Sequence, residues 1–135
     1  MKSILWIITT TKDTPLTVQH AFHQAQTQDV QLAVLFVLDP RLAGSFTHDY
    51  EDSSKRKFSD LEMRAAGKNV VLKTLLKKGD IAQECVNAIR ELKPTEIIFT
   101  KMRGSQFSRF FFSTAADKVK TAAGCPVTVI EEKEG

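Results

Sequence analysis

Short, continuous apolar runs alternate along the chain with segments whose apolar residues recur at helical spacing. The runs are rich in β-branched residues, which is typical of strands buried on both faces of a parallel sheet. The helical segments have one apolar face and one charged face, as helices that cover a sheet do. The pattern therefore predicts five strands in alternation with four helices. The strands are expected at 4–8, 30–38, 70–76, 96–100 and 126–131, and the helices at 15–25, 53–66, 81–92 and 114–123.

Proline marks two of the predicted boundaries. Pro15 follows Asp13 and Thr14, which offer a cap residue, and proline is favoured at the first helical position. Pro40 closes the second strand, because the residue before a proline is pushed out of the helical region. Some segments lack a sustained period or are highly charged, and we expect them to be irregular. These are two loops at 41–52 and 101–112 and a solvated tail at 131–135.

Alternation of this kind favours a three-layer α/β sandwich with a parallel sheet and right-handed crossovers. In open sheets of this class, ligands bind beyond the carboxyl ends of the strands, where the strand order reverses. The loops to inspect therefore follow the first and fourth strands, at 9–14 and 101–112. No internal repeat is present, so we expect a single domain over 1–135.

The composition is that of an ordinary soluble domain, with 42% hydrophobic and 26% charged residues among 135. The net charge of +3 is too small to indicate nucleic acid by bulk electrostatics. The apolar runs fall far short of the roughly 20 residues that a membrane-spanning helix needs. Cys85 and Cys125 are far apart and form no C-x-x-C pair, which favours free thiols in a reducing compartment. We expect a cytoplasmic protein.

Two segments give the chain a family resemblance. They are KKGDIAQECVNAIRELKPTEIIFT at 77–100 and RGSQFSRFFFSTAADKVKTAAGCPVTVI at 103–130. With them the chain resembles the universal stress proteins over nearly its whole length. The resemblance implies a five-stranded Rossmann-like sandwich with strand order 3-2-1-4-5.

The resemblance also implies where a nucleotide would bind. Members that bind ATP have a phosphate loop G-x-x-G, nine residues, then G-[S/T], and an aspartate after the first strand. In this chain Lys101 takes the first glycine position and Gly104 keeps the second. The third position falls on Ser113 if one residue is lost in between, with Thr114 at the hydroxyl position, or on Thr114 without a gap. Thr9 takes the aspartate position and cannot act as a carboxylate acceptor.

Glycines in such a loop let the backbone approach a phosphate and point N–H groups at it. Their loss predicts that this chain does not bind ATP in the usual way. Lys101, Arg103, Arg109 and nearby hydroxyls still surround the expected start of the last helix. One interpretation is an anion site at that helix start, and the other is a solvated basic loop with Thr114 as a helix cap.

Two further features suggest ligands, and simpler interpretations compete with both. Phe107 and 110–112 lie among arginines, a pattern that can stack single-stranded bases. The low net charge favours rings that pack onto the sheet or fill a subunit interface, so we predict no nucleic-acid partner. His20 and His23 stand three residues apart, a spacing at which both can ligate a metal. No third ligand is indicated, so we predict no metal site.

The last strand, 126–131, is expected at the edge of the sheet, where unpaired main-chain groups invite a partner. The resemblance implies that two copies pair antiparallel through it, as a two-fold dimer allows. The competing interpretation is that Glu131, Glu132 and Lys133 keep the edge free as charged gatekeepers. We favour the homodimer.

These inferences predict a cytoplasmic, homodimeric universal stress protein that acts as a stress-response binding or regulatory module. No nucleophile elbow, Walker loop or zinc-protease motif is present, so we predict no enzymatic activity and no cofactor. No membrane partner is expected. The alternative is a member that binds ATP or AMP through a divergent phosphate loop.

Overall fold

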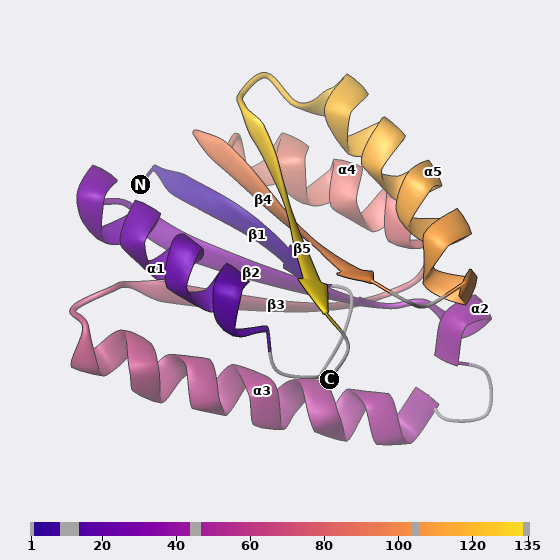
Figure 1. Ribbon diagram of the computed structural model, residues 1–135, viewed down its shortest axis with the longest axis horizontal. Coiled ribbons are helices and arrows are strands. Elements are labelled where there is room, and N and C mark those ends of the chain that lie inside the picture. Colours follow the sequence, from indigo (N-terminus) through magenta and orange to yellow (C-terminus); the bar gives the residue numbers. More distant parts are fainter. Residues whose placement is uncertain (1, 9–13, 44–46, 104–105, 134–135) are drawn as a thin grey trace.

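The computed structural model describes residues 2–8, 14–43, 47–103 and 106–133, with side chains for all of these except 42–43, 47–48, 102–103 and 106–112. Within these ranges the chain forms one sheet and five helices (Figure 1). The strands are β1 (Ser3–Ile8), β2 (Gln31–Leu38), β3 (Leu72–Lys78), β4 (Glu96–Arg103) and β5 (Val127–Lys133). The helices are α1 (Pro15–Gln28), α2 (Pro40–Ala43), α3 (Thr47–Gly67), α4 (Ile81–Leu92) and α5 (Gln106–Ala122).

The sheet has the order β3-β2-β1-β4-β5, and every neighbouring pair is parallel. Helices α1 and α3 cover one face, and α4 and α5 cover the other (Figure 1). The predicted three-layer sandwich and its strand order are therefore confirmed. The order reverses between β1 and β4, so the carboxyl ends of these two strands form the switch point. None of the helices in the described ranges combines the length and apolar character that a membrane span requires.

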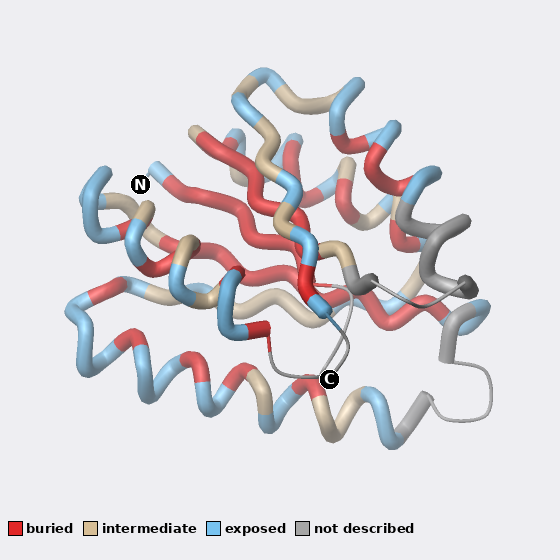
Figure 2. The backbone as a smooth tube through the Cα atoms, viewed as in Figure 1, coloured by how far each residue is buried: buried red, intermediate tan, exposed pale blue. Residues whose placement is uncertain are grey.

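Two apolar cores lie on either side of β1, whose six residues are all buried (Figure 2). Ile4, Trp6 and Ile8 pack under α1 and α3, whereas Leu5 and Ile7 pack under α4 and α5. Because successive side chains of a strand point to opposite faces, a strand that is covered on both sides needs an unbroken apolar run.

One buried polar contact ties the central strand to its neighbour. Trp6 is fully buried, and its indole Nε1–H donates to Thr100 Oγ1 at 3.0 Å. Thr100 lies one residue past Phe99, the last residue of β4 that pairs with β1. The bond thus joins β1 to the part of β4 that continues past the last residue paired with β1.

The predicted loop at 41–52 is wrong. Pro40–Ala43 forms α2, and α3 begins at Thr47. The first turns of α3 are polar, so no apolar period reveals them. Glu51 stabilises these turns through ion pairs with Lys55 at 3.6 Å, one turn later, and with Lys78 of β3 at 3.0 Å.

The predicted loop at 101–112 is also wrong. β4 continues to Arg103, and α5 already begins at Gln106. The extra residues of β4 pair with β5, with Lys101 opposite Glu131. The apolar pattern ends at the close of the expected strand, and only the partner strand keeps the following polar residues extended.

The expected solvated tail is likewise corrected. β5 continues to Lys133, and Glu132 is only 3% exposed. Glu132 therefore does not act as an exposed gatekeeper of the sheet edge. Residues 134–135 lie outside the described ranges.

Thr100→Val tests the contact inside the core. The substitution keeps the shape of the side chain and removes the acceptor for the Trp6 indole, and an orphaned buried donor costs roughly 1–3 kcal/mol. We expect the free energy of unfolding to fall by about 2 kcal/mol. Urea unfolding followed by the fluorescence of Trp6, the sole tryptophan, measures the change. Thr128→Val on β5 is the control, and an equal loss in both variants would contradict a role for the indole bond.

Candidate functional site

Three of the sequence-predicted site residues fall where side chains are not described. Thr9 and Gly104 lie outside the described residues, and Arg103 is the last residue of β4, described for its backbone alone. The other three, Lys101, Ser113 and Thr114, are described completely. Their positions decide what remains of the expected phosphate loop.

Lys101 lies inside β4 and is half-buried, paired in register with Glu131 of β5. A loop that cradles phosphate directs several successive N–H groups at one point. A strand sends successive N–H groups to opposite sides and commits one set of them to the neighbouring strand. At the position that resembles the first glycine of the loop, the backbone is therefore extended and paired with β5.

Ser113 and Thr114 are exposed on α5, at its eighth and ninth residues counted from Gln106. Only the first four N–H groups of a helix lack an acceptor within it, so these residues lie beyond the helix start. The expectation that Thr114 caps the last helix is wrong, because the helix begins two turns earlier. The structure does not bring the two hydroxyls to the switch point as capping groups.

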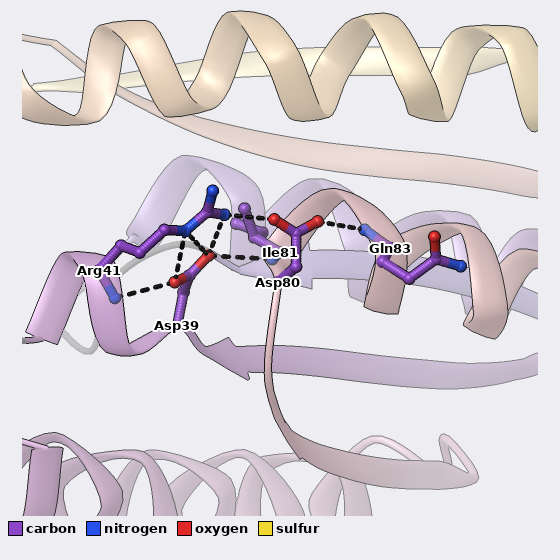
Figure 3. Close-up of polar contacts among 5 residues, drawn as sticks. All are labelled: Asp39, Arg41, Asp80, Ile81 and Gln83. Atoms are coloured by element: carbon purple, nitrogen blue, oxygen red, sulfur yellow. Dashed lines mark hydrogen bonds and ion pairs between the residues drawn. The ribbon is translucent and has the colours of Figure 1, made fainter.

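A cluster of ion pairs lies at the carboxyl end of β2 (Figure 3). Asp39 is only 2% exposed. Its Oδ1 accepts hydrogen bonds from Arg41 N at 2.9 Å and Arg41 Nε at 3.0 Å. Its Oδ2 accepts from Arg41 Nη2 at 2.6 Å and from Ile81 N at 3.1 Å. One carboxylate thus caps both α2 and α4.

Arg41 joins this carboxylate to a second one. Its Nη2 also bonds Asp80 Oδ1, and Asp80 Oδ2 accepts from Gln83 N at 2.9 Å as the N-cap of α4 (Figure 3). The hydrogen bond to Asp39 raises the pKa of Arg41. Burial alone would raise the pKa of Asp39, but hydrogen bonds from Arg41 and Ile81 outweigh it and hold that pKa below its ordinary value. Arg41 and main-chain N–H groups of α2 and α4 together satisfy both carboxylates, and the cluster is a structural clasp.

A second long-range contact closes the start of α1. Glu132 Oε1 accepts from Leu16 N at 3.2 Å. Its Oε2 accepts from Thr17 N at 3.0 Å and from Thr17 Oγ1 at 2.8 Å. The carboxyl end of β5 is therefore attached to the first turn of the helix that follows β1.

A groove of about 120 Å³ lies beside this contact, between α1 and α3. Two of the side chains that line it are cations. Lys57 Nζ donates to Thr14 Oγ1 at 3.4 Å, and Arg64 Nε contacts Asp60 Oδ2 at 3.1 Å. Both cations are engaged within the chain, so the groove is a weak candidate for an anion site.

The two thiols are poor nucleophiles. Burial raises the pKa of Cys85 to about 12, with Asp80 and Glu84 adding to the effect. Burial, and then Glu96, raise the pKa of Cys125. Both thiols are protonated at neutral pH and lack the thiolate form that reacts.

The histidines with metal-ligand spacing lie on α1. His20 Nε2 is 3.7 Å from Glu96 Oε2 on β4, whereas His23 is exposed. Among the residues that the structure describes, no group of three or more histidine, cysteine or carboxylate side chains is arranged to hold a metal ion. The side chains of Phe107 and of 110–112 lie outside those described.

Sequence reasoning missed the clasp and the contact of Glu132. Asp39 and Pro40 have the form of a cap residue followed by a proline at the first helical position, which is a signal for a helix start. That signal could have revealed α2. No local signal identifies Glu132, because its acceptor role depends on residues more than a hundred positions away.

The chain is similar to proteins of one known family. The profile of the universal stress protein family matches residues 1–131. No curated protein sequence matches the chain.

Solved structures have the same fold. The hypothetical protein MJ0577 has a TM-score of 0.75 at 16% identity, covering 99% of this chain and 98% of that one. A universal stress protein from Archaeoglobus fulgidus in complex with dAMP has a TM-score of 0.66 at 15% identity, covering 96% and 97%. A universal stress protein in complex with cAMP has a TM-score of 0.68 at 12% identity, covering 96% of each chain. At these identities the likeness shows the fold alone.

Asp39→Asn tests the clasp. The variant keeps the side-chain shape and removes the charge that Arg41 and Ile81 bind, so we expect the free energy of unfolding to fall by about 2 kcal/mol at neutral pH. The folded pKa of Asp39 lies below its unfolded value of 3.8. Its contribution is therefore present above that value and is lost as pH falls through the folded pKa. The variant should show a weaker loss of stability in acid than the wild type.

Urea unfolding at a series of pH values from neutral to acid measures both effects. Asp60→Asn is the matched control, because Asp60 forms an exposed pair with Arg64 that contributes at most about 1 kcal/mol. Equal losses in the two variants, or an unchanged acid dependence in Asp39→Asn, would show that the clasp does not stabilise the fold.

Proposed function

The chain belongs to the universal stress protein family, and we propose that it acts as a stress-response binding module that does not hold ATP through the family's glycine loop. The observation that supports this most directly is the length of β4. The strand continues through Lys101 to Arg103 and pairs there with β5. A lysine within a strand cannot replace a glycine that brings the backbone up to a phosphate.

The other described positions support the same proposal. Ser113 and Thr114 lie beyond the first two turns of α5, where the helix uses its own N–H groups. Thr9 in place of an aspartate removes a carboxylate acceptor from the first loop. The residues present therefore do not fit a triphosphate bound in the usual way.

A signalling role through protein contacts follows from the same proposal. The carboxylates of the clasp are engaged with Arg41, and the thiols of Cys85 and Cys125 are protonated, so none of these four groups is an activated nucleophile. We propose a non-enzymatic module in the cytoplasm, where free thiols persist.

The second candidate function is nucleotide binding through a divergent loop. Two proteins with this fold have been solved with cAMP and with dAMP. A monophosphate carries less charge than ATP and needs fewer backbone donors, so Lys101 and Arg103 could hold it by charge. Nucleotide titration separates this candidate from the first.

We also propose a homodimer that pairs through the edge strand at 126–131. Ile97 N of β4 donates to Pro126 O, so Pro126 and alternate residues after it point their main-chain groups at β4. Val127 and Val129 then direct theirs away from the sheet, and the Val129 side chain is 38% exposed. A second copy can satisfy these groups through a two-fold axis.

The opposite edge of the sheet is less suited to pairing. β3 presents the exposed lysines Lys73, Lys77 and Lys78 in a strand of seven residues. Like charges along an edge repel a second copy of the same edge. Lysines on edge strands of other proteins prevent pairing in this way. The contrast between the two edges favours β5.

Calorimetric titration tests the ATP proposal. We expect no saturable heat from magnesium ATP at millimolar concentration, with AMP titrated in parallel to test the second candidate. Lys101→Gly should increase the heat or the affinity if the lost glycine is the cause of weak binding. Micromolar ATP binding that weakens in Gly104→Val or Thr114→Ala would overturn the first proposal and support a working divergent loop.

Val129→Pro tests the dimer. Proline removes the outward N–H of Val129 and leaves the ladder to β4 in place, because prolines are tolerated on edge strands. By sedimentation or light scattering we expect twice 15.1 kDa for the wild type and 15.1 kDa for the variant. Thr74→Pro, which alters the outward side of β3 in the same way, should remain dimeric. A monomeric wild type, or a dimeric Val129→Pro with a monomeric Thr74→Pro, would reject pairing through β5.

A further inference from the structure

Among the residues that the structure describes, Thr14 and the first turn of helix α1 supply no side-chain cap. Thr14 occupies the N-cap position but makes no side-chain capping bond, and the first turn contains no acidic residue. The first N–H groups of a helix have no acceptor within it and carry partial positive charge. The first N–H groups of α1 therefore need an acceptor that Thr14 does not supply.

Glu132 supplies that acceptor from the other end of the described chain. Its carboxylate is 3% exposed and accepts the N–H groups of Leu16 and Thr17 and the hydroxyl of Thr17. A buried carboxylate is costly unless such bonds compensate its loss of water, and bonds to a charged acceptor are stronger than neutral ones. Glu132 and the first turn of α1 therefore stabilise each other.

The strand that bears Glu132 is also the free edge of the sheet. Glu132 pairs in register with Met102, in the part of β4 and β5 that runs beyond β1. On its inner side this extension is held by β4, and it continues directly from Val129, whose main-chain groups point away from the sheet. A strand that pairs with the outer side of β5 therefore restrains the backbone that carries the Glu132 side chain to α1.

We propose that the carboxyl end of β5 is a strap, in which Glu132 fixes the first turn of α1 and a second copy paired along β5 tightens that hold. The second half of this inference rests on the proposed homodimer. Thr14 ends the loop that joins β1 to α1, one of the two loops at the switch point. The strap thus links the partner edge of the sheet to the start of α1 through one carboxylate.

Hydrogen exchange of single amides in the full chain tests the strap. The N–H groups of Leu16 and Thr17 are the donors to Glu132, so Glu132→Ala should speed their exchange by about tenfold or more. Glu131→Ala is the matched control, because it removes the same charge from the neighbouring exposed position. Glu132→Gln, which keeps one acceptor oxygen, should give an intermediate rate and covers the case in which the alanine variant does not fold.

Unchanged exchange at Leu16 and Thr17 in both Glu132 variants would overturn the strap. Equal acceleration in Glu131→Ala would overturn it too, since a general loss of negative charge would then be the cause. Acceleration confined to the Glu132 variants supports it.

To test the link between the β5 edge and α1, amide exchange must be compared in the dimeric and monomeric forms of the protein. Exchange at Leu16 and Thr17 should be several-fold faster in monomeric Val129→Pro than in the dimeric wild type, and Glu132→Ala should abolish this difference. Equal rates in dimer and monomer would overturn the link. A wild type that is monomeric at every concentration would reject both the homodimer and the link, while the comparison of Glu132→Ala with Glu131→Ala would still decide the strap.

Discussion

The burial of β1 on both faces is the constraint on which the rest of the structure depends. All six of its residues are buried, so charged groups have no place along the strand and gather at the ends of the sheet. The same architecture leaves the starts of α1, α2 and α4 at the carboxyl edge, with N–H groups that need acceptors. Asp39, Asp80 and Glu132 supply carboxylates there. At the edge where open sheets bind ligands, this chain provides anions of its own.

The parts of the fold that could be predicted are those in which burial determines residue type. The strands β1 and β2 and the helix α4 lie within a residue of their expected bounds, because their apolar faces are needed by the two cores. Two of the parts that escaped are polar. The first turns of α3 and the end of β4 are fixed by a partner, such as Lys78 beside Glu51, and a partner across space leaves no period in the sequence.

The features of the candidate site also fall into those that the sequence could predict and those that it could not. The replacement of glycine by Lys101 was visible in the sequence, and with it the departure from the usual phosphate loop. That Lys101 lies within a strand was not visible, because the pairing with Glu131 depends on the register of β5. The role of Asp39 had a local signal in the proline that follows it, whereas the role of Glu132 had none.

The contact between Glu132 and α1 gives the fold a dependence on the order in which the chain is made. α1 is synthesised before β5, and its acceptor follows 115 residues after Thr17. Contacts of such separation form late, since a long segment must first be closed. A nascent chain could assemble its central strands and still hold an unfinished first helix until β5 has joined the sheet. A polypeptide that lacks β5 through interrupted synthesis or proteolysis would keep that defect, so quality-control proteases would find an opening at α1, far along the sequence from the cut.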